Sequence, residues 1–153
     1  MSAVLQPLPW FEPMREGDID AVAGIEQRIY AFPWTVGNFR DSMRAGYSCW
    51  VHRDRERIIG YAVLMLAAGE AHLLNLSIDA AFQRRGHGAR LLQHLMDFAR
   101  GHQVKQFFLE ARPSNAAGNA LYAKCGFRQL AVRRDYYPAQ EGREDALLLV
   151  REL

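Results

Sequence analysis

The sequence predicts a single α/β domain in which helices pack in layers against a central sheet. Strand-like and helical segments alternate along the chain in the order β-αα-βββ-α-β-α-ββ. The 153 residues suit one compact domain, and a content of 50% hydrophobic and 24% charged residues is typical of a globular protein. We expect residues 1–10 to form an irregular lead-in and residues 11–153 to form the domain.

The first predicted elements are a short extended segment, at about residues 11–15, and two helices. Asp18 is expected to cap the first helix. Pro33 ends this helical region, because proline disfavours helical geometry at the residue before it. Thr35 is expected to cap the second helix, which ends near Gly46.

Three strand-like runs and one long helix follow. The runs cover residues 47–52, 58–66 and 72–79, and polar or glycine-containing turns separate them. Residues 86–100 form the clearest helix of the sequence, because apolar side chains recur on one face and polar side chains on the other.

The C-terminal part of the chain predicts one helix between strands. Residues 106–111 form an apolar strand, after which Ser114 or Asn115 caps a short helix. Two further strands, at about residues 127–134 and 146–151, close the chain around a polar loop.

Charge and cysteine content exclude several classes of protein. The formal net charge is +2, so we expect no direct nucleic-acid partner. Lys105 and Lys124 are the only lysines among 19 basic residues, and both nucleotide bias in the source genome and phosphate binding by arginine remain open explanations. Cys49 and Cys125 lack disulfide or metal-ligand spacing and are expected to be reduced, buried thiols.

The sequence shows no sign of export, of a membrane span or of a metal site. The first 13 residues lack a basic region and a long apolar run, and no stretch approaches the roughly 18 apolar residues that a membrane span needs. We therefore expect a soluble, cytoplasmic protein without a membrane partner. The five histidines show no ligand spacing, so no metal is expected.

The most informative stretch lies between the third strand-like run and the long helix. Gly86 and Gly88 let the backbone approach a ligand closely, and the helix N-terminus adds about half a positive charge. Arg84 and Arg85 add formal charge beside it. Together these features suit phosphate or pyrophosphate, although a plain strand-to-helix turn is the alternative. Neither the P-loop pattern nor the dinucleotide-binding fingerprint is present.

Several motifs resemble those of a known superfamily. The pattern Gln83-x-x-Gly86-x-Gly88, after a strand that reads LSID, resembles the acetyl-CoA motif of the Gcn5-related N-acetyltransferase (GNAT) superfamily. Residues 109–127, LEARPSNAAGNALYAKCGF, resemble its second signature. The fragments IEQR, AFPW, RDYYP and GREDA are similar to the RimI-type ribosomal-protein-alanine N-acetyltransferases. The resemblance covers about residues 11–151.

The resemblance implies a fold and a co-substrate. The implied GNAT fold is a mixed, mostly antiparallel sheet of about seven strands, splayed between strands 4 and 5 and flanked by four helices. The implied co-substrate is acetyl-CoA, whose pantetheine arm pairs with a bulged strand and whose diphosphate is held by loop amides. The implied coenzyme-binding residues are Leu76, Ser77, Ile78, Gln83, Arg84, Arg85, Gly86, His87, Gly88, Ala89 and Asn115.

The resemblance also implies direct attack in a ternary complex, with Glu110 as the base and Tyr122 as the acid. A phenol that titrates near 10 suits a thiolate leaving group. Proton transfer from an N-terminal amine to a free glutamate is uphill by about 5 kcal/mol, so burial of the carboxyl group or a water relay must reduce that cost. His72, on the preceding strand, is the alternative base.

Aromatic residues and prolines point to the acceptor side. The resemblance places two loops beside the acceptor entrance, where we expect them to hold a peptide and to exclude lysine side chains. Their residues are Phe32, Pro33 and Trp34 in one loop, and Tyr136, Tyr137 and Pro138 in the other. The implied acceptor is the N-terminal alanine of a small-subunit ribosomal protein, and a small-molecule amine is the alternative. A monomer or weak dimer is expected.

Overall fold

The computed structural model describes residues 9–153, which form seven strands and four α-helices around one sheet. The strands are β1 (Trp10–Pro13), β2 (Ser48–Asp54), β3 (Arg57–Ala67), β4 (Glu70–Ile78), β5 (Gln106–Ala111), β6 (Arg128–Pro138) and β7 (Arg143–Glu152). The helices are α1 (Ile19–Ile29), α2 (Val36–Arg44), α3 (His87–Gly101) and α4 (Ala116–Lys124), and two short 3₁₀ turns cover Glu16–Asp18 and Ala80–Phe82.

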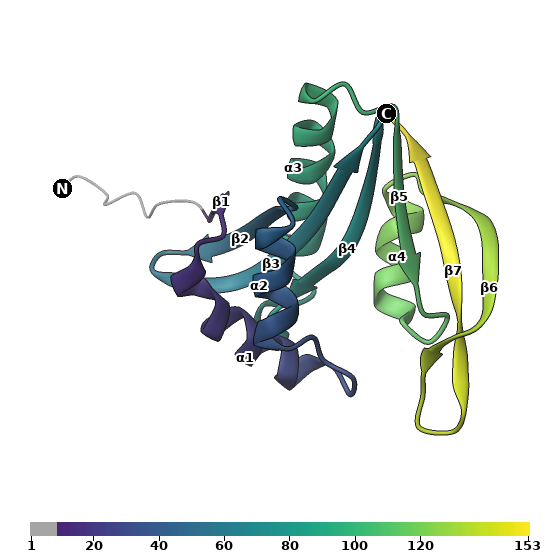
Figure 1. Ribbon diagram of the computed structural model, residues 1–153, viewed down its shortest axis with the longest axis horizontal. Helices are drawn as coiled ribbons and strands as arrows, with labels where there is room; N and C mark the ends of the chain where they lie inside the picture. The colour runs from purple at the N-terminus through teal and green to yellow at the C-terminus, as the bar shows by residue number, and fades with distance from the viewer. Residues whose placement is uncertain (1–8) are drawn as a thin grey trace.

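The sheet has the order β1-β2-β3-β4-β5-β7-β6, and its strands diverge in the middle (Figure 1). All neighbouring strands are antiparallel except β4 and β5, which run parallel. The β4–β5 pairing extends only from Glu70 and Gln106 to Leu73 and Leu109. Beyond Leu73 the two strands separate, as the predicted splay between strands 4 and 5 requires.

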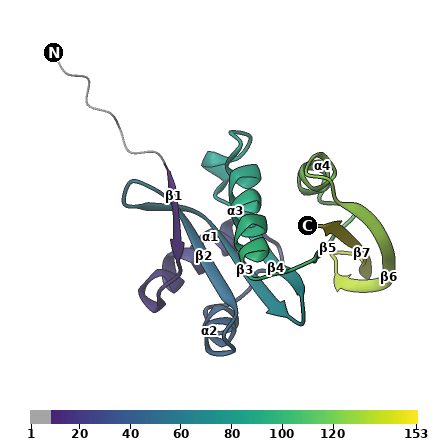
Figure 2. The ribbon, with the colours of Figure 1, turned by 90° about the horizontal axis from the view of Figure 1, so that it is seen from above.

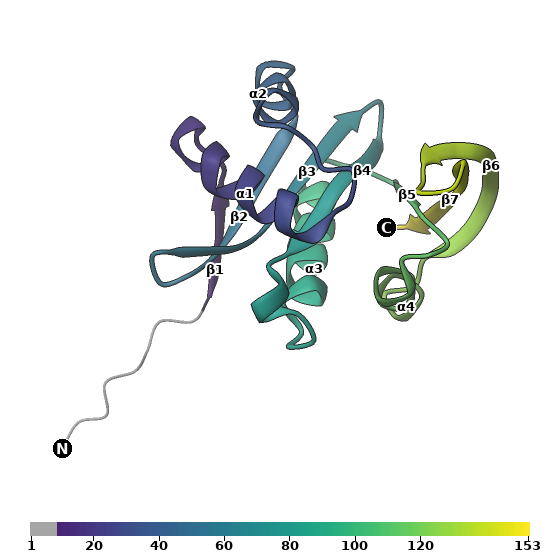
Figure 3. The same cartoon turned by 90° about the horizontal axis from the view of Figure 1, so that it is seen from below.

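The helices cover both faces of this sheet (Figures 2 and 3). Helices α1 and α2 lie on one face, and α3 and α4 lie on the other. Strand β3 shows why both faces are covered: Tyr61 and Val63 belong to the apolar cluster under α1 and α2, whereas Ala62 and Leu64 belong to the cluster under α3 and α4. The side chains of a strand alternate between faces, so a strand buried on both sides is apolar throughout.

The predicted elements are all present, and two of the predicted caps are confirmed. The hydroxyl of Thr35 accepts a hydrogen bond from the N–H of Asn38, and the side chain of Asn115 accepts one from Gly118. Asp18 differs from the prediction, because its side chain makes no cap hydrogen bond to α1. Its carboxylate instead accepts from the N–H of Arg15 and the guanidinium of Arg53.

The C-terminal strands are longer than predicted. Tyr136, Tyr137 and Pro138 lie within β6 rather than in a loop. The strand continues because a bulge between Arg133 and Tyr137 absorbs the polar residues at which the prediction ended it. Asp135, at φ 52°, lies in this bulge.

Other predictions concern the chain ends and the cysteines. Residues 1–8 of the predicted lead-in lie outside the described residues. Trp10, its last residue, belongs to β1. Cys49 and Cys125 are both free thiols, but only Cys49 is buried, and burial raises its pKa to about 11. Among residues 9–153, no helix is both long and apolar enough to cross a membrane.

Candidate active site

Two adjoining cavities lie where β4 and β5 separate. The first has a volume of about 290 Å³ and is lined by Glu26, Tyr30, Phe32, Trp34, Leu74, Asn75, Leu76, Glu110, Ala111, Arg112, Asn115, Tyr122, Tyr137 and Pro138. The second, of about 310 Å³, shares Trp34, Leu74, Glu110 and Tyr137 with the first and adds His72, Leu73, Phe108, Leu109, Tyr136 and Leu148. Residues from both halves of the chain therefore meet in one continuous cleft.

The cleft exists because the backbone of β4 changes its pairing at one residue. The register between β3 and β4 shifts so that Val63 pairs with Asn75 while Leu64 pairs with Leu73. Leu74 is therefore the bulged residue, two positions before the predicted segment, and it lies at the point where pairing with β5 ends. Leu76, Ser77 and Ile78 pair regularly with β3, so their edge toward β5 is available to a ligand.

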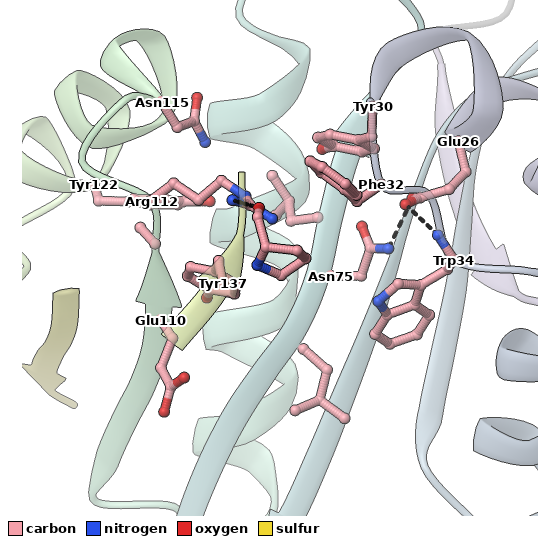
Figure 4. A pocket seen from close by; sticks show the side chains of 14 residues that line it. Glu26, Tyr30, Phe32, Trp34, Asn75, Glu110, Arg112, Asn115, Tyr122 and Tyr137 are labelled. Atoms are coloured by element: carbon pink, nitrogen blue, oxygen red, sulfur yellow. Dashed lines mark hydrogen bonds between the residues drawn. The ribbon is translucent and has the colours of Figure 1, made fainter. Parts of the chain in front are cut away.

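The two predicted catalytic residues lie on the same wall of the cleft (Figure 4). Tyr122 comes from α4 and Glu110 from β5, and the carboxylate of Glu110 points away from Tyr122, toward the second cavity. Burial raises the pKa of Tyr122, so its phenol keeps its proton at physiological pH. Glu110 forms an ion pair with Arg133 at 3.4 Å. A proton donor and a carboxylate thus face different parts of one cleft.

The alternative base, His72, lines the second cavity together with Glu110. Its Nε2 lies 2.9 Å from a carboxylate oxygen of Glu70, and its ring stacks on Phe108 at 5.1 Å between centroids. The structure therefore places both candidate bases at the same cavity, on neighbouring strands.

The predicted anion-binding loop makes a left-handed turn into α3. Arg84, at φ 63°, and Gly86, at φ 81°, both adopt left-handed conformations, and α3 begins directly after them. Such turns direct backbone N–H groups outward at a helix N-terminus, which is a geometry that binds phosphate. Gly88 lets α3 and α4 approach, because a Cβ there would lie 3.3 Å from a methyl group of Leu121.

The side chains of this loop differ in what they can offer a ligand. Arg84 and Arg85 are exposed, whereas His87 is 8% exposed and directed into the core. Gln83 donates a hydrogen bond to the carbonyl of Ile78 at 2.9 Å, and so links the loop to the end of β4. A coenzyme can therefore contact His87 only through its backbone. The backbone of Ala89, two residues further along the first turn of α3, is also available.

His87 belongs to a cluster of three histidines behind the loop, of which His52 and His87 are buried and His94 is half-buried. Its Nδ1 lies 3.1 Å from Nε2 of His52, whose Nδ1 donates to the carbonyl of Trp10. His94 stacks with Phe11, which also stacks on His52. Burial lowers the pKa of all three histidines, and the charge of the neighbouring Arg90 lowers the pKa of His52 and His87 further.

This cluster predicts a loss of stability in mild acid. Because each folded-state pKa is lowered, the folded state binds fewer protons than the unfolded state below about pH 6.5, where free histidine titrates. The contribution of the neutral histidines to the free energy of unfolding is therefore complete above that pH. It is lost as the pH falls toward the lower pKa values that these histidines have in the folded state. Urea unfolding at pH 7.5, 6.5 and 5.5 should show a decrease of up to about 1.4 kcal/mol per pH unit for each histidine. His102→Asn, at an exposed position, should keep this slope, and a flat profile would contradict the prediction.

The predicted acceptor residues are only partly brought together. Phe32, Trp34 and Tyr137 line the first cavity, whereas Tyr136 lines only the second and packs edge-on against Tyr137 at 4.9 Å. Pro33 is exposed and lines neither cavity.

Arg112 is a cleft residue that sequence reasoning did not select. Its guanidinium donates to the carbonyl of Pro138 at 2.8 Å and to Glu144 at 3.2 Å, and it lies 4.4 Å from the ring centroid of Tyr137 and 5.8 Å from that of Phe32. One side chain therefore joins the end of β5 to both aromatic segments. Its place directly after Glu110 and Ala111 in the second signature was the available signal.

Three further lining residues, Glu26, Tyr30 and Asn75, were also missed as site residues (Figure 4). Glu26 appeared only as part of the fragment IEQR. Among the described residues, no group of three or more histidine, cysteine, aspartate or glutamate side chains is arranged to hold a metal ion.

The chain is similar in sequence and in structure to known acetyltransferases. The family model "Acetyltransferase (GNAT) family" matches residues 19–127. The [ribosomal protein bS18]-alanine N-acetyltransferase of Escherichia coli K12 is 38% identical over 132 residues, which are 86% of this chain and 89% of the relative. The [ribosomal protein bS18]-alanine N-acetyltransferase of Haemophilus ducreyi is 32% identical over 139 residues, which are 90% of this chain and 96% of the relative. The crystal structure of the ribosomal-protein-S18-alanine N-acetyltransferase from Escherichia coli superposes with a TM-score of 0.89 at 34% identity and covers 95% of this chain and 94% of that one.

Proposed function

Because the chain belongs to the acetyltransferase (GNAT) family, we propose that it transfers the acetyl group of acetyl-CoA to the N-terminal α-amino group of a protein, namely the N-terminal alanine of ribosomal protein bS18. Relatives that carry this name cover most of the chain. In this proposal the acetyltransferase domain covers the predicted residues 11–153 and also Trp10, because β1, β6 and β7 belong to the same sheet as the part matched by the family model.

One observation carries this proposal: the cleft is walled by aromatic side chains from two distant segments and has a proton donor and a carboxylate on one side. Phe32 and Trp34 come from the segment between α1 and α2, and Tyr137 comes from β6. Arg112 holds these walls together. In this proposal the aromatic walls hold an extended N-terminus, and its neutral α-amine is the nucleophile that attacks the thioester.

The proposed reaction is direct attack of the amine on the thioester carbon. The C–N bond forms, the C–S bond breaks, Glu110 accepts a proton from the amine directly or through water, and Tyr122 gives its proton to the departing thiolate. The backbone of Leu76, Ser77 and Ile78 binds the pantetheine arm, and a backbone N–H of this segment stabilises the developing oxyanion, which is worth about 3–4 kcal/mol at comparable sites.

The loop and the first turn of α3 hold the diphosphate. In this proposal the backbone N–H groups from Arg84 to Ala89 bind the phosphate oxygens, and the guanidinium groups of Arg84 and Arg85 add charge at the rim. Gln83 positions the loop through Ile78. Asn115, whose side chain caps α4, reaches the first cavity from the coenzyme side.

Mass spectrometry of acetylated bS18 tests this function. The purified chain, incubated with acetyl-CoA and bS18, is expected to add one acetyl group at the α-amine of the N-terminal alanine. A bS18 sample with a chemically blocked α-amine and free lysines is the matched control and should remain unmodified. Acetylation of lysine side chains alone would contradict the proposal, as would turnover restricted to small-molecule amines in a thiol-release assay.

A further inference from the structure

A buried carboxylate stands at the start of a chain of hydrogen bonds that runs along one wall of the cleft. Glu26, on α1, is 2% exposed. One of its oxygens accepts from the side-chain amide of Asn75 at 2.8 Å and from the hydroxyl of Tyr61 at 2.9 Å, and the other accepts from the N–H of Trp34 at 3.0 Å. Three donors that converge on one carboxyl group suit its ionised form, which can only accept.

From Asn75 the chain continues to the cavity surface. The side-chain oxygen of Asn75 accepts from the hydroxyl of Ser77 at 2.8 Å. The hydroxyl oxygens of Ser77 and Tyr30 lie 2.6 Å apart. Ser77 is buried, whereas Tyr30 lines the first cavity together with Glu26 and Asn75 (Figure 4).

The carboxylate fixes the direction of every bond in this chain. Since Glu26 can only accept, Asn75 must turn its NH₂ group toward Glu26 and its oxygen toward Ser77. Ser77 donates its single hydroxyl hydrogen to that oxygen. The hydrogen between Ser77 and Tyr30 must then come from Tyr30. The phenol oxygen of Tyr30 is left with free lone pairs and no hydrogen to offer, so it is an acceptor toward the cavity.

The surroundings of Tyr30 keep it in this state. Burial raises the pKa of Tyr30 and outweighs the hydrogen bond with Ser77, which lowers it; the charge of Glu26 raises the pKa as well, so the phenol does not ionise near neutral pH. Tyr30 in turn contributes to the raised pKa of Tyr122, which lines the same cavity. The cleft therefore holds two tyrosines with opposite roles, one free to donate a proton and the other committed as an acceptor.

We propose that the phenol oxygen of Tyr30 accepts an N–H hydrogen from the acceptor amine and so orients the nitrogen lone pair toward the thioester. This inference rests on the proposed function. A neutral amine has N–H hydrogens to donate and one lone pair to attack with, so holding one N–H limits the directions in which the lone pair can point. Glu26, Asn75 and Ser77 are positioning residues, because they act on the amine only through Tyr30.

The test compares two peptides that differ only in the amine. One is a peptide that begins with alanine, and the other begins with a propionyl group, in which hydrogen replaces the amino group. Calorimetry with the enzyme–CoA complex at pH 8.5, where the N-terminal amine is mostly neutral, measures the Kd of each. Tyr30→Phe and Ser77→Ala are expected to weaken binding of the alanine peptide by roughly three- to tenfold, and to leave the propionyl peptide within about twofold.

Tyr47→Phe is the matched control. It also removes one tyrosine hydroxyl, but Tyr47 lies beside Met43 and Trp50 and lines neither cavity of the cleft. This variant is expected to keep both peptide affinities. Glu26→Gln, which has one acceptor oxygen instead of two, should reproduce the selective loss seen with Ser77→Ala.

Two results would overturn the inference: equal weakening of both peptides, which would show that Tyr30 only shapes the cavity, or no change in either. Failure of the proposed function is read separately, from the wild type alone. A wild type that neither binds the alanine peptide nor acetylates it contradicts the proposed function, whereas a wild type that acetylates it while Tyr30→Phe shows no selective loss contradicts only the role of Tyr30.

Discussion

Tyr122→Phe is expected to lower kcat by a factor of about 100 to 1,000 while the Kd for acetyl-CoA stays within about twofold. Without a proton the thiolate is a poor leaving group, and the phenol of Tyr122 is a proton source in the cleft. Burial raises the pKa of Tyr122, so the phenol is protonated near neutral pH but is a weaker acid than a free tyrosine. Phenylalanine keeps the packing, since the ring of Tyr122 stands edge-on to Phe127 at 6.0 Å. Steady-state kinetics with an alanine-starting peptide and calorimetry with acetyl-CoA measure the two effects.

The control for this variant is Tyr47→Phe. Tyr47 lies beside Met43 and Trp50, remote from the cleft, and loss of its hydroxyl should leave kcat unchanged. In a thioester of a more acidic thiol, the thiolate can leave without being protonated by Tyr122. The loss of kcat in Tyr122→Phe should therefore be smaller with such a substrate. An unchanged kcat with acetyl-CoA, or an equal defect with both thioesters, would contradict the role of Tyr122 as the acid.

Glu110→Gln is expected to lower kcat by about 100-fold, because the amide cannot accept the proton that the amine loses. In the Glu110→Gln variant, the low-pH side of the profile of kcat/KM against pH should also differ from that of the wild type. Glu110 lines both cavities and so lies where they adjoin. Initial rates between pH 6 and 9 measure the effect.

The matched control is Glu152→Gln. Glu152 is also a strand glutamate paired with an arginine, since it lies 3.9 Å from Arg128, but it stands at the opposite end of the β5–β7 pairing. It should have wild-type rates. His72→Asn separates the two candidate bases: a large loss with His72→Asn and a small one with Glu110→Gln would assign the base to His72 and contradict the prediction for Glu110.

Much of the fold was predictable because the signals are local. The long helix α3 follows from an apolar face and a glycine-rich start, and the caps Thr35 and Asn115 act on N–H groups three residues away. Asp18 was predicted as a cap from the same local rule and is not one. Its carboxylate forms an ion pair with Arg53, 35 residues further along the chain. A long-range ion pair of this kind cannot be predicted from the local sequence pattern.

The candidate site was predictable in part for the same reason. The anion-binding loop is a contiguous stretch, so its glycines and arginines indicate it directly. The roles of Arg112 and Glu26 depend on partners far away in the chain, such as Pro138, 26 residues after Arg112, and Asn75, 49 residues after Glu26. Their residue types alone predict only a charged side chain near a strand end and a polar residue on a helix.

The sequence by itself determined the order of elements and the family to which the chain belongs, and it predicted the anion-binding loop, because each is a pattern among residues close in the chain. Only the tertiary structure decided that the bulge lies at Leu74, that β6 continues to Pro138, and that the hydroxyl groups of Tyr30 and Ser77 share a hydrogen bond. The direction of a hydrogen bond is defined only once both partners are in place. Folding brings Glu26, Asn75, Ser77 and Tyr30 together from two separate elements, and no local pattern contains that arrangement.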